Sequence, residues 1–155
     1  MSSGTSQHEY LSEMEFRAWH GSLSFANGAM AALDAALRQA HGISLSEFDV
    51  LITLYNAPDR RLRMSELTQR VLITASGMTQ LVTRLERGGL VSRTVDEADR
   101  RSFFATMTAA GDDRLREARP THNEVVRERL VRRLSREQLT ELGNLWDVVG
   151  ALPKR

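Results

Sequence analysis

The sequence of 155 residues contains no cysteine, three prolines and a single lysine, Lys154. Without cysteine the chain has no disulfides, no thiolate metal ligands and no thiol-based peroxide sensor. No apolar stretch is long enough to span a membrane, and the polar residues 1–9 lack the apolar core of a signal peptide. We therefore expect a cytoplasmic protein without membrane contact.

Residue patterns of enzymes and metal sites are also missing. A zinc site needs several nitrogen or sulfur ligands that converge, and no two of the histidines stand four residues apart. Only distant histidines that meet in the fold could build such a site. There is no serine–histidine–aspartate context and no phosphate-cradling glycine loop. We therefore expect no catalytic residues, no metal and no resident cofactor. The histidines are His8, His20, His41 and His122.

Charge is present but unevenly distributed. The formal net charge is only +1, yet the stretch from Arg60 to Arg101 holds nine arginines and five acidic residues, a local balance of +4 that leaves −3 for the remainder. A basic segment attached to a mildly acidic scaffold is typical of a DNA-contacting module. A randomly uneven surface would have the same composition, so charge alone permits nucleic-acid binding without identifying it.

An amphipathic pattern predicts a long first helix that ends near Gly42, after a disordered tail over residues 1–8. Gly42 occupies the position expected of a glycine just after a helix. A helix this long must pack against another helix of the chain or against a partner chain. Its apolar positions follow steps of three and four: Phe16, Trp19, Leu23, Ala26, Met30, Leu33 and Leu37.

A second helix is predicted to begin at Ser44, where Ser44 and Glu47 form a capping-box pattern. Pro58 and Asp59 end it, and Leu62–Arg63 could form a small strand. The predicted buried face of this helix consists of Phe48, Leu51, Ile52 and Tyr55.

Two short helices follow, over residues 64–70 and 75–87, separated by a turn at Val71–Ile73. Thr74 is placed to cap the second one, and Gly88–Gly89 stops it. The period then changes from helical to alternating, so Leu90–Val95 and Phe103–Thr108 are predicted to form a β-hairpin around a polar loop.

The C-terminal part predicts two more helices. The first runs over residues 109–133, and Pro120 should kink it or lie near its first turns. The second begins at the capping-box pattern Ser135–Gln138. Its apolar stripe consists of Leu139, Leu142, Trp146 and Val149.

The helix over residues 75–87 has two chemically different faces. The core face consists of Met78, Leu81, Val82 and Leu85. Hydroxyl, amide and guanidinium groups on the other face are those that bond base edges and phosphates in a major groove, although any solvated helix can carry them. That outer face consists of Ser76, Thr79, Gln80, Thr83, Arg84 and Arg87.

The hairpin loop strengthens the DNA-binding interpretation. Arg100 and Arg101 lie at its tip, and Asp99 is close enough to orient a guanidinium. A narrow minor groove attracts arginine electrostatically. A solvated turn with charges for solubility is the alternative, but a polar helix followed by a basic hairpin favours DNA. The predicted DNA-binding residues are Ser76, Thr79, Gln80, Thr83, Arg84, Arg87, Asp99, Arg100 and Arg101.

These segments resemble the MarR family of winged helix-turn-helix regulators. Asp99–Arg101, Ala105–Thr108 and Gly111 are similar to the family's wing signature, and Met64–Leu67 and Leu81–Val91 look like its helix-turn-helix. The resemblance covers residues 10–150. It implies a homodimer with interlocked terminal helices, two winged lobes that read a pseudo-palindrome, and Arg101 in the minor groove with Asp99 orienting it.

The resemblance also implies a fold and a domain organisation. The fold is mainly α with a small β-hairpin wing: a winged helix-turn-helix lobe over residues 44–108, a dimerisation helix over 9–42 and C-terminal dimerisation helices over 109–150. The implied function is that of a transcription regulator that binds double-stranded DNA, a repressor that a small ligand releases from the DNA. The alternative is a helical dimeric interaction protein that binds no DNA.

A small-molecule effector follows from the same resemblance. Trp19, Asp49 and Arg93 match three positions of the family's urate-responsive branch, whereas Leu81 stands where that branch has an arginine. A phenolic or other aromatic acid is then the expected effector, in a cleft between the dimer helices and the lobe. Alternatively, Trp19 is a core residue and Asp49 and Arg93 form an ion pair. The candidate ligand-binding residues are Arg17, Trp19, His20, Asp49 and Arg93.

Overall fold

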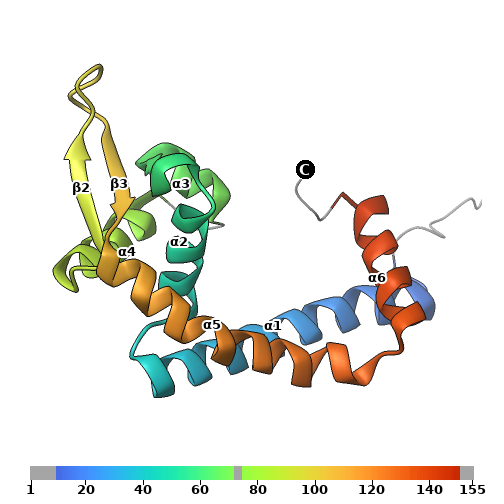
Figure 1. The fold of residues 1–155 in the computed structure, drawn as a ribbon. Helices are drawn as coiled ribbons and strands as arrows, with labels where there is room; N and C mark the ends of the chain where they lie inside the picture. Colours follow the sequence, from blue (N-terminus) through green and yellow to red (C-terminus); the bar gives the residue numbers. More distant parts are fainter. Residues whose placement is uncertain (1–9, 72–74, 151–155) are drawn as a thin grey trace, which may run out of the picture.

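The computed structural model describes residues 10–71 and 75–150 (Figure 1). The predicted tail at 1–8, most of the turn at 71–73 and the Thr74 cap lie outside these residues. Within the described part, no helix is long and apolar enough to cross a membrane. The elements are α1 (Glu13–His41), α2 (Leu45–Tyr55), η1 (Pro58–Arg60), β1 (Arg61–Arg63), α3 (Met64–Arg70), α4 (Ala75–Arg87), β2 (Val91–Val95), β3 (Phe103–Met107), α5 (Ala109–Arg129), η2 (Val131–Arg133) and α6 (Arg136–Val148).

The long first helix is confirmed. It begins with a capping box between Ser12 and Glu15 and ends at Gly42, whose φ of 67° is left-handed. Glycine adopts that conformation without the steric cost that a side chain would add. Asp34 near the end of α1 accepts a hydrogen bond from the Leu45 N–H at 2.9 Å, so the last turns of α1 are tied to the start of α2.

The second helix begins at the predicted Ser44–Glu47 capping box and supplies much of the core. Phe48, Leu51 and Leu54 are fully buried. The prediction for Tyr55 was wrong: its side chain is 38% exposed. Leu54 takes the buried position instead, and the Tyr55 ring lies between the guanidiniums of Arg60 and Arg119, at 4.7 and 4.8 Å.

The wing is part of a three-stranded antiparallel sheet with strand order β1-β3-β2. The possible strand at Leu62–Arg63 is confirmed as β1, which pairs with β3 through Leu62 opposite Ala105. Both residues are buried. Because side chains alternate between the faces of a strand, this row fixes which face of the sheet packs on the core of the lobe.

The helix-turn-helix pair has the predicted bounds, with α3 at Met64–Arg70 and α4 at Ala75–Arg87. The predicted core face of α4 is confirmed, because all four of its apolar side chains are buried. This burial fixes the rotation of α4 about its own axis and leaves the polar face outward. The four side chains are Met78, Leu81, Val82 and Leu85.

The start of α5 is locked to the segment that links α4 and β2. Thr108 caps α5 by accepting from the Gly111 N–H at 3.0 Å, and its own hydroxyl donates to the Gly89 carbonyl at 2.7 Å. The Thr108 N–H also donates to the Leu90 carbonyl. At Gly111 the backbones are so close that a Cβ would lie 2.1 Å from the Leu90 carbonyl oxygen.

The end of α5 differs from the prediction. The α-helix stops at Arg129, and Val131–Arg133 form a 3₁₀ turn. Pro120 lies inside the helix, beyond its first turns, and the helix continues through it. The predicted capping box at Ser135 is confirmed at the start of α6.

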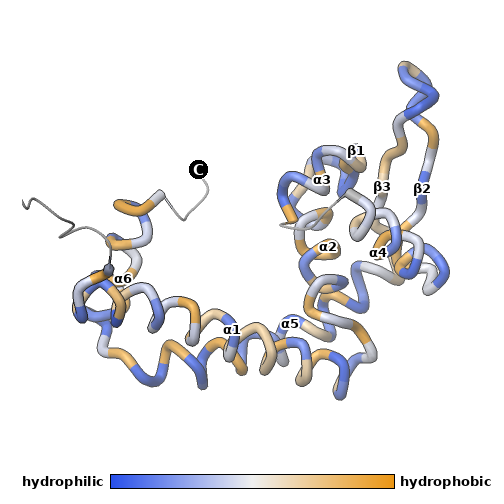
Figure 2. Tube along the Cα trace, turned by 180° about the vertical axis from the view of Figure 1, so that it is seen from behind, coloured by the Kyte–Doolittle hydropathy of each residue, from blue (hydrophilic) through white to orange (hydrophobic). Residues whose placement is uncertain are grey.

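The chain has a lobe at one end and a long arm at the other (Figures 1 and 2). Helices α1 and α5 pack side by side and leave the lobe together, and α6 lies at the far end near the start of α1. Trp19 is 61% exposed in the single chain. The alternative that Trp19 is a core residue of the chain was therefore wrong. Other exposed apolar side chains of α1 and α6 are Met14, Phe16, Leu23, Phe25, Met30, Leu145 and Val148.

Candidate nucleic-acid interface

The outer face of α4 carries the polar side chains that the sequence placed there. Ser76, Thr79, Gln80 and Arg87 are exposed, and Thr83 is half-buried. The Thr83 hydroxyl donates to the carbonyl of Thr79 at 2.8 Å, which fixes its rotamer along the helix. The face therefore presents hydroxyls, an amide and a guanidinium to solvent, the chemistry that reads base edges.

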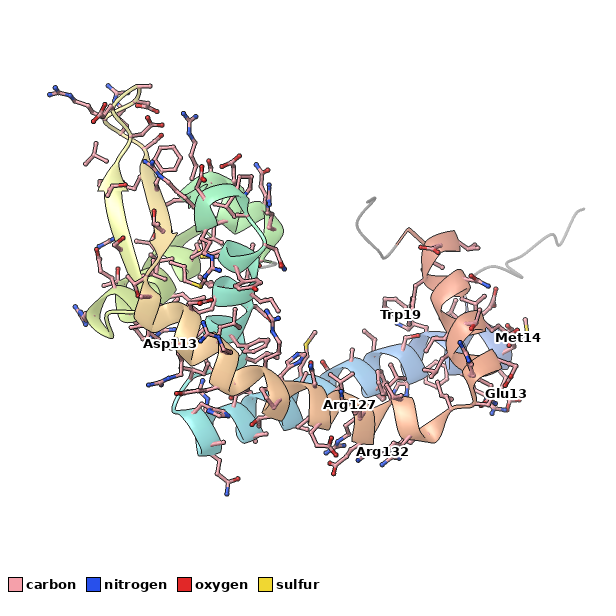
Figure 3. The ribbon with its side chains drawn as sticks, in the orientation of Figure 1. Glu13, Met14, Trp19, Asp113, Arg127 and Arg132 are labelled. Carbon is pink, nitrogen blue, oxygen red and sulfur yellow. The ribbon has the colours of Figure 1, made fainter. Side chains whose placement is uncertain are left out.

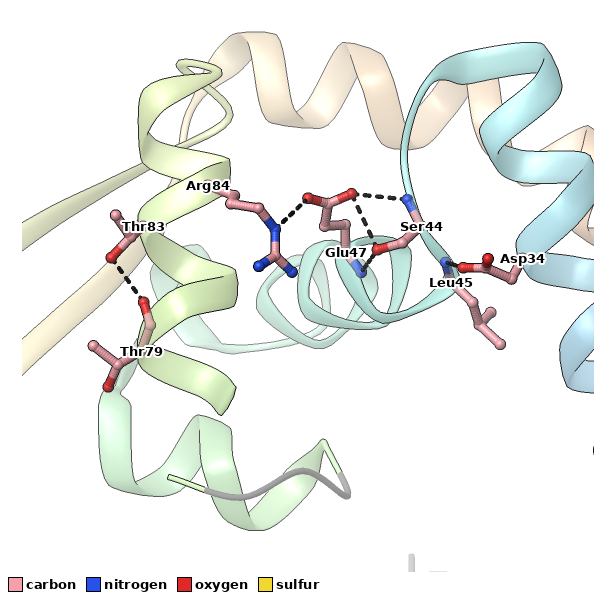
Figure 4. A network of polar contacts seen from close by, with 7 residues as sticks. All are labelled: Asp34, Ser44, Leu45, Glu47, Thr79, Thr83 and Arg84. Atoms are coloured by element: carbon pink, nitrogen blue, oxygen red, sulfur yellow. Dashed lines mark hydrogen bonds and ion pairs between the residues drawn. The ribbon is translucent and has the colours of Figure 1, made fainter. Parts of the chain in front are cut away.

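Arg84 lies at the border of this face and makes a contact that the sequence did not reveal. Its Nε is 3.5 Å from Glu47 Oε1 on α2, and Figure 4 shows Arg84 directed toward the start of α2, away from Thr79 and Thr83. Glu47 also accepts from the N–H and the hydroxyl of Ser44, at 2.8 and 3.0 Å. Arg84 thereby joins α4 to a helix N-terminus.

Asp99 organises the backbone of the wing loop. Its carboxylate accepts from the Arg101 N–H at 3.1 Å and from the Ser102 hydroxyl at 2.7 Å. These bonds, the one from Ser102 first, lower the pKa of Asp99. The expected orientation of the Arg101 guanidinium by Asp99 is not what the structure has, since their ion pair does not occur among the described residues. Arg100 and Arg101 are exposed.

A groove of about 350 Å³ joins α3, α4 and the wing. Thr79 of α4 and Arg101 of the wing both line it, so the structure brings the two predicted DNA-contacting elements to one surface. Arg63 and Ser65, at the start of α3, also line it and were missed. The only sequence signal for them is their position in the first turn of the helix-turn-helix.

The candidate ligand residues do not come together within one chain. Arg93 forms an ion pair with Glu86 at 2.8 Å, so the alternative of an Asp49–Arg93 pair was wrong. Asp49 lines a different hollow, of about 440 Å³, between α1, α2 and α3, which also contains Met30 and Arg70. Trp19 lies three helical turns before Met30, roughly 16 Å along the axis of α1.

Asp49 has an unusual electrostatic environment. Burial raises the pKa of its carboxyl, and the charge of His122 opposes that rise without overcoming it. The His122 ring stacks on Phe48, with ring centroids 4.6 Å apart. Asp49 thus feels the charge of a residue on α5, while its side chain lines the hollow shared with α1 and α3.

The other candidate ligand residues lie at the far end of the arm. Figure 3 shows Trp19 on α1 near α6, away from the lobe. The His20 ring stacks on Phe16 with centroids 5.2 Å apart, and its Nδ1 is 3.3 Å from the Ser24 hydroxyl. Arg17 and His20 are exposed.

The sequence and the fold both match known regulators. A family model described as MarR family matches residues 41–102. Over 115 residues the chain is 30% identical to the HTH-type transcriptional regulator MhqR of Bacillus subtilis (strain 168). The aligned region covers 74% of this chain and 77% of MhqR. Over 81 residues it is 36% identical to the HTH-type transcriptional repressor YetL of the same organism, 52% of this chain and 48% of YetL. The chain thus spans about half of the length of YetL.

A solved structure extends the match to nearly the whole chain. Sco3205, a MarR family transcriptional regulator from Streptomyces coelicolor solved in complex with DNA, is 33% identical and has a TM-score of 0.85. The match covers 95% of this chain and 94% of that one. The chain belongs to the MarR family of winged helix-turn-helix transcriptional regulators.

Proposed function

We propose that this protein is a sequence-specific DNA-binding repressor that binds a pseudo-palindromic operator as a homodimer. The observation that carries the proposal is the single surface formed by the polar face of α4, the groove and the wing tip with Arg101. The proposed contacts are Ser76, Thr79, Gln80, Thr83 and Arg87 in the major groove, with Arg100 and Arg101 in the minor groove. Sco3205, a family member at 33% identity, was solved with DNA.

The exposed apolar face of the arm supports the homodimer. Trp19 and its neighbours on α1 repeat at helical spacing, and α6 adds Leu145 and Val148 at the same end of the molecule. A monomeric protein rarely exposes contiguous apolar surface of this kind. A second copy would bury both sets at once, because a two-fold interface pairs each patch with its own copy.

The sign of regulation is inferred from a relative. YetL, which matches over about half its length, is a transcriptional repressor. We adopt repression for this protein, and operator occupancy that blocks transcription is the mechanism this implies.

The hollow between α1, α2 and α3 supports release by a small aromatic acid. Its volume of about 440 Å³ suits a single ring system. The Arg70 guanidinium at its rim offers a charge partner for a carboxylate, and Asp49, whose pKa burial raises, offers a hydroxyl when protonated. In a dimer, Trp19 or Arg17 of the second chain would complete the walls.

Selection of bound duplexes from a random DNA pool tests the proposal. We expect a two-fold symmetric consensus, and the logarithm of the affinity for it should fall linearly with the logarithm of the salt concentration. Addition of salicylate should weaken binding to the selected duplex. A chain that forms dimers but binds no DNA at low salt would instead be the interaction protein of the alternative hypothesis.

A further inference from the structure

The sheet has an outer face of which the groove described above uses only Arg63. Residues opposite one another in the register share a face. Arg63, Phe104 and Thr94 form one row, and Arg61, Thr106 and Ser92 form the next. The alternate row of Leu62, Ala105 and Arg93 points the other way. The outer face thus combines two arginines, one aromatic ring and three hydroxyls.

Arg61 lies over an aromatic ring on this face. Its guanidinium carbon lies 3.8 Å from the centroid of the Phe104 ring, and one of its terminal nitrogens is 3.5 Å from the Thr94 hydroxyl. Arg63 lies over the same ring at 5.5 Å. The ring therefore serves as a platform that restricts the Arg61 guanidinium, and the side chain stays exposed to solvent.

Arg61 differs from its two neighbours in having no carboxylate partner within the described residues. Arg60 pairs with Asp112 at 2.6 Å, and Arg63 lies 2.7 Å from Asp96 Oδ2. That oxygen of Asp96 is buried and accepts no hydrogen bond of good geometry, so its attraction to Arg63 is mainly electrostatic. The positive charge of Arg61 is consequently the one left available on this face.

A stacked, unpaired guanidinium is a strong candidate for binding a phosphate. Its planar edge can donate two parallel hydrogen bonds to phosphate oxygens. Because the ring already restricts the side chain, little conformational entropy is lost on binding. The neighbouring hydroxyls of Ser92, Thr94 and Thr106 are further donors, and no unpaired carboxylate of the described face opposes an anion.

The topology indicates where that phosphate lies. Arg93, on the inner face, pairs with Glu86 of α4, so the inner face is turned toward the DNA-reading helix and the outer face away from it. A minor groove is only about 6 Å wide, and a wing tip that enters it has a phosphate backbone on either side. DNA that continues past the wing therefore runs along the outer face.

From these contacts we propose that Arg61, stacked on Phe104, binds the phosphate backbone of the duplex beyond the wing, outside the bases read by α4. This role rests on the proposed DNA binding and extends the footprint without adding sequence specificity. An acidic protein surface would need the same positive charge, but its contact would be independent of duplex length, which the test below separates.

Two duplexes of different length test the role of Arg61 in the full-length protein. Both carry the selected operator; one ends at the base pairs reached by the wing, and the other continues for about ten base pairs, one helical turn, on each side. We expect Arg61→Ala to weaken binding of the long duplex about three- to tenfold and to reduce its salt slope by about 0.9 per lost phosphate contact. Binding of the short duplex should be unchanged.

Matched variants keep the outcome interpretable. Arg61→Lys retains the charge but not the planar edge and should recover part of the long-duplex affinity. Arg129→Ala removes an exposed arginine at the distant end of α5 and should bind both duplexes like wild type. Equal weakening of both duplexes by Arg61→Ala, or wild-type binding of both, would overturn the role of Arg61. If the wild-type protein bound neither duplex, the proposed function itself would fail.

Discussion

Glu47 on α2 and Arg84 on α4 lie 3.5 Å apart, and this contact ties the first turn of α2 to the helix that we propose reads DNA. Asp34 connects the same turn to α1 through the Leu45 N–H. A bond from Arg38 and then the one from Leu45 lower the pKa of Asp34, so it is charged and able to accept at neutral pH. Helices α1 and α4 are thus linked through one helix N-terminus, that of α2 (Figure 4).

Arg84→Ala and Gln80→Ala should therefore have different effects on DNA recognition. Arg84 has a partner on α2, so we expect its removal to lower affinity for all duplexes by about 1 kcal/mol or less, as for an exposed ion pair. Gln80 faces outward, and its loss should change the preferred sequence, by about 1–3 kcal/mol at one base pair. Competition binding against single-base operator variants measures both. A changed base preference in Arg84→Ala would show that it contacts bases directly.

Arg101→Ala should weaken operator binding while the fold stays intact, because its side chain is exposed at the wing tip. We expect a loss of about 1–3 kcal/mol and a shallower salt dependence. Fluorescence anisotropy at several salt concentrations measures affinity, and thermal unfolding checks the fold. Arg129→Ala is the control for the loss of one positive charge. Wild-type affinity in Arg101→Ala would exclude the wing tip from the interface.

Trp19→Glu should convert the proposed dimer to a monomer. In the dimer it would place a charge inside an apolar interface, which is strongly unfavourable unless the charge is paired. Light scattering after size-exclusion chromatography measures the mass, and the wild-type melting temperature should rise with protein concentration. Gln39→Glu, on the opposite side of α1, should remain dimeric. A Trp19→Glu protein with unchanged mass would contradict the interface.

Asp49→Asn should stabilise the protein at neutral pH. Burial raises the pKa of Asp49 above its unfolded value, so folding favours the protonated carboxyl. Stability is therefore lost as the pH rises from the unfolded pKa through the raised folded pKa, and the full cost remains at higher pH. The amide removes this cost, so the variant should melt higher at pH 7. The difference should vanish near about pH 3, one unit below the ordinary pKa of Asp, where the carboxyl is protonated in both states. Asp113→Asn, which changes an exposed carboxylate on α5, is the control. Thermal unfolding curves recorded across this pH range measure the difference in stability. A gain in melting temperature that persisted at low pH would contradict burial of the charged carboxylate as its cause.

Gly111→Ala should destabilise the protein. The added Cβ would lie 2.1 Å from the Leu90 carbonyl oxygen, and neither backbone can move without shifting α5. We expect a cost of about 1–3 kcal/mol or more. At Gly21 an added Cβ meets nothing within 4 Å, so Gly21→Ala should instead stabilise α1 by about 0.5–1 kcal/mol. Chemical denaturation measures both changes, and similar stability of the two variants would contradict the close approach.

Local signals were sufficient to predict most of the fold. The capping boxes at Ser44 and Ser135 and the glycine at Gly42 mark the helix ends, since such caps depend on residues three or four apart. The core face of α4 follows from periodicity alone. Gly111 could be recognised from the family signature, but its contact with Leu90 could not.

Contacts between side chains of different helices and strands were not predictable. Arg84 appears as one more polar residue of a helix face until α2 brings Glu47 beside it, 37 positions away. The partner of Arg93 is Glu86 because β2 returns along α4, whereas sequence reasoning considered Asp49. Tyr55 was misplaced because two guanidiniums from other elements replace the core as its surroundings.

The joint between Leu90 and Gly111 has a geometric consequence for the operator. Because the two backbones touch there, α4 and α5 keep a fixed relative orientation. An α-helix turns about 100° and advances about 1.5 Å with each residue. One residue inserted in α5 beyond the joint would therefore rotate the whole lobe about the axis of the arm. The helical phase of α5, a helix outside the proposed DNA surface, would then determine the angle at which each lobe meets the duplex and the spacing between the two half-sites.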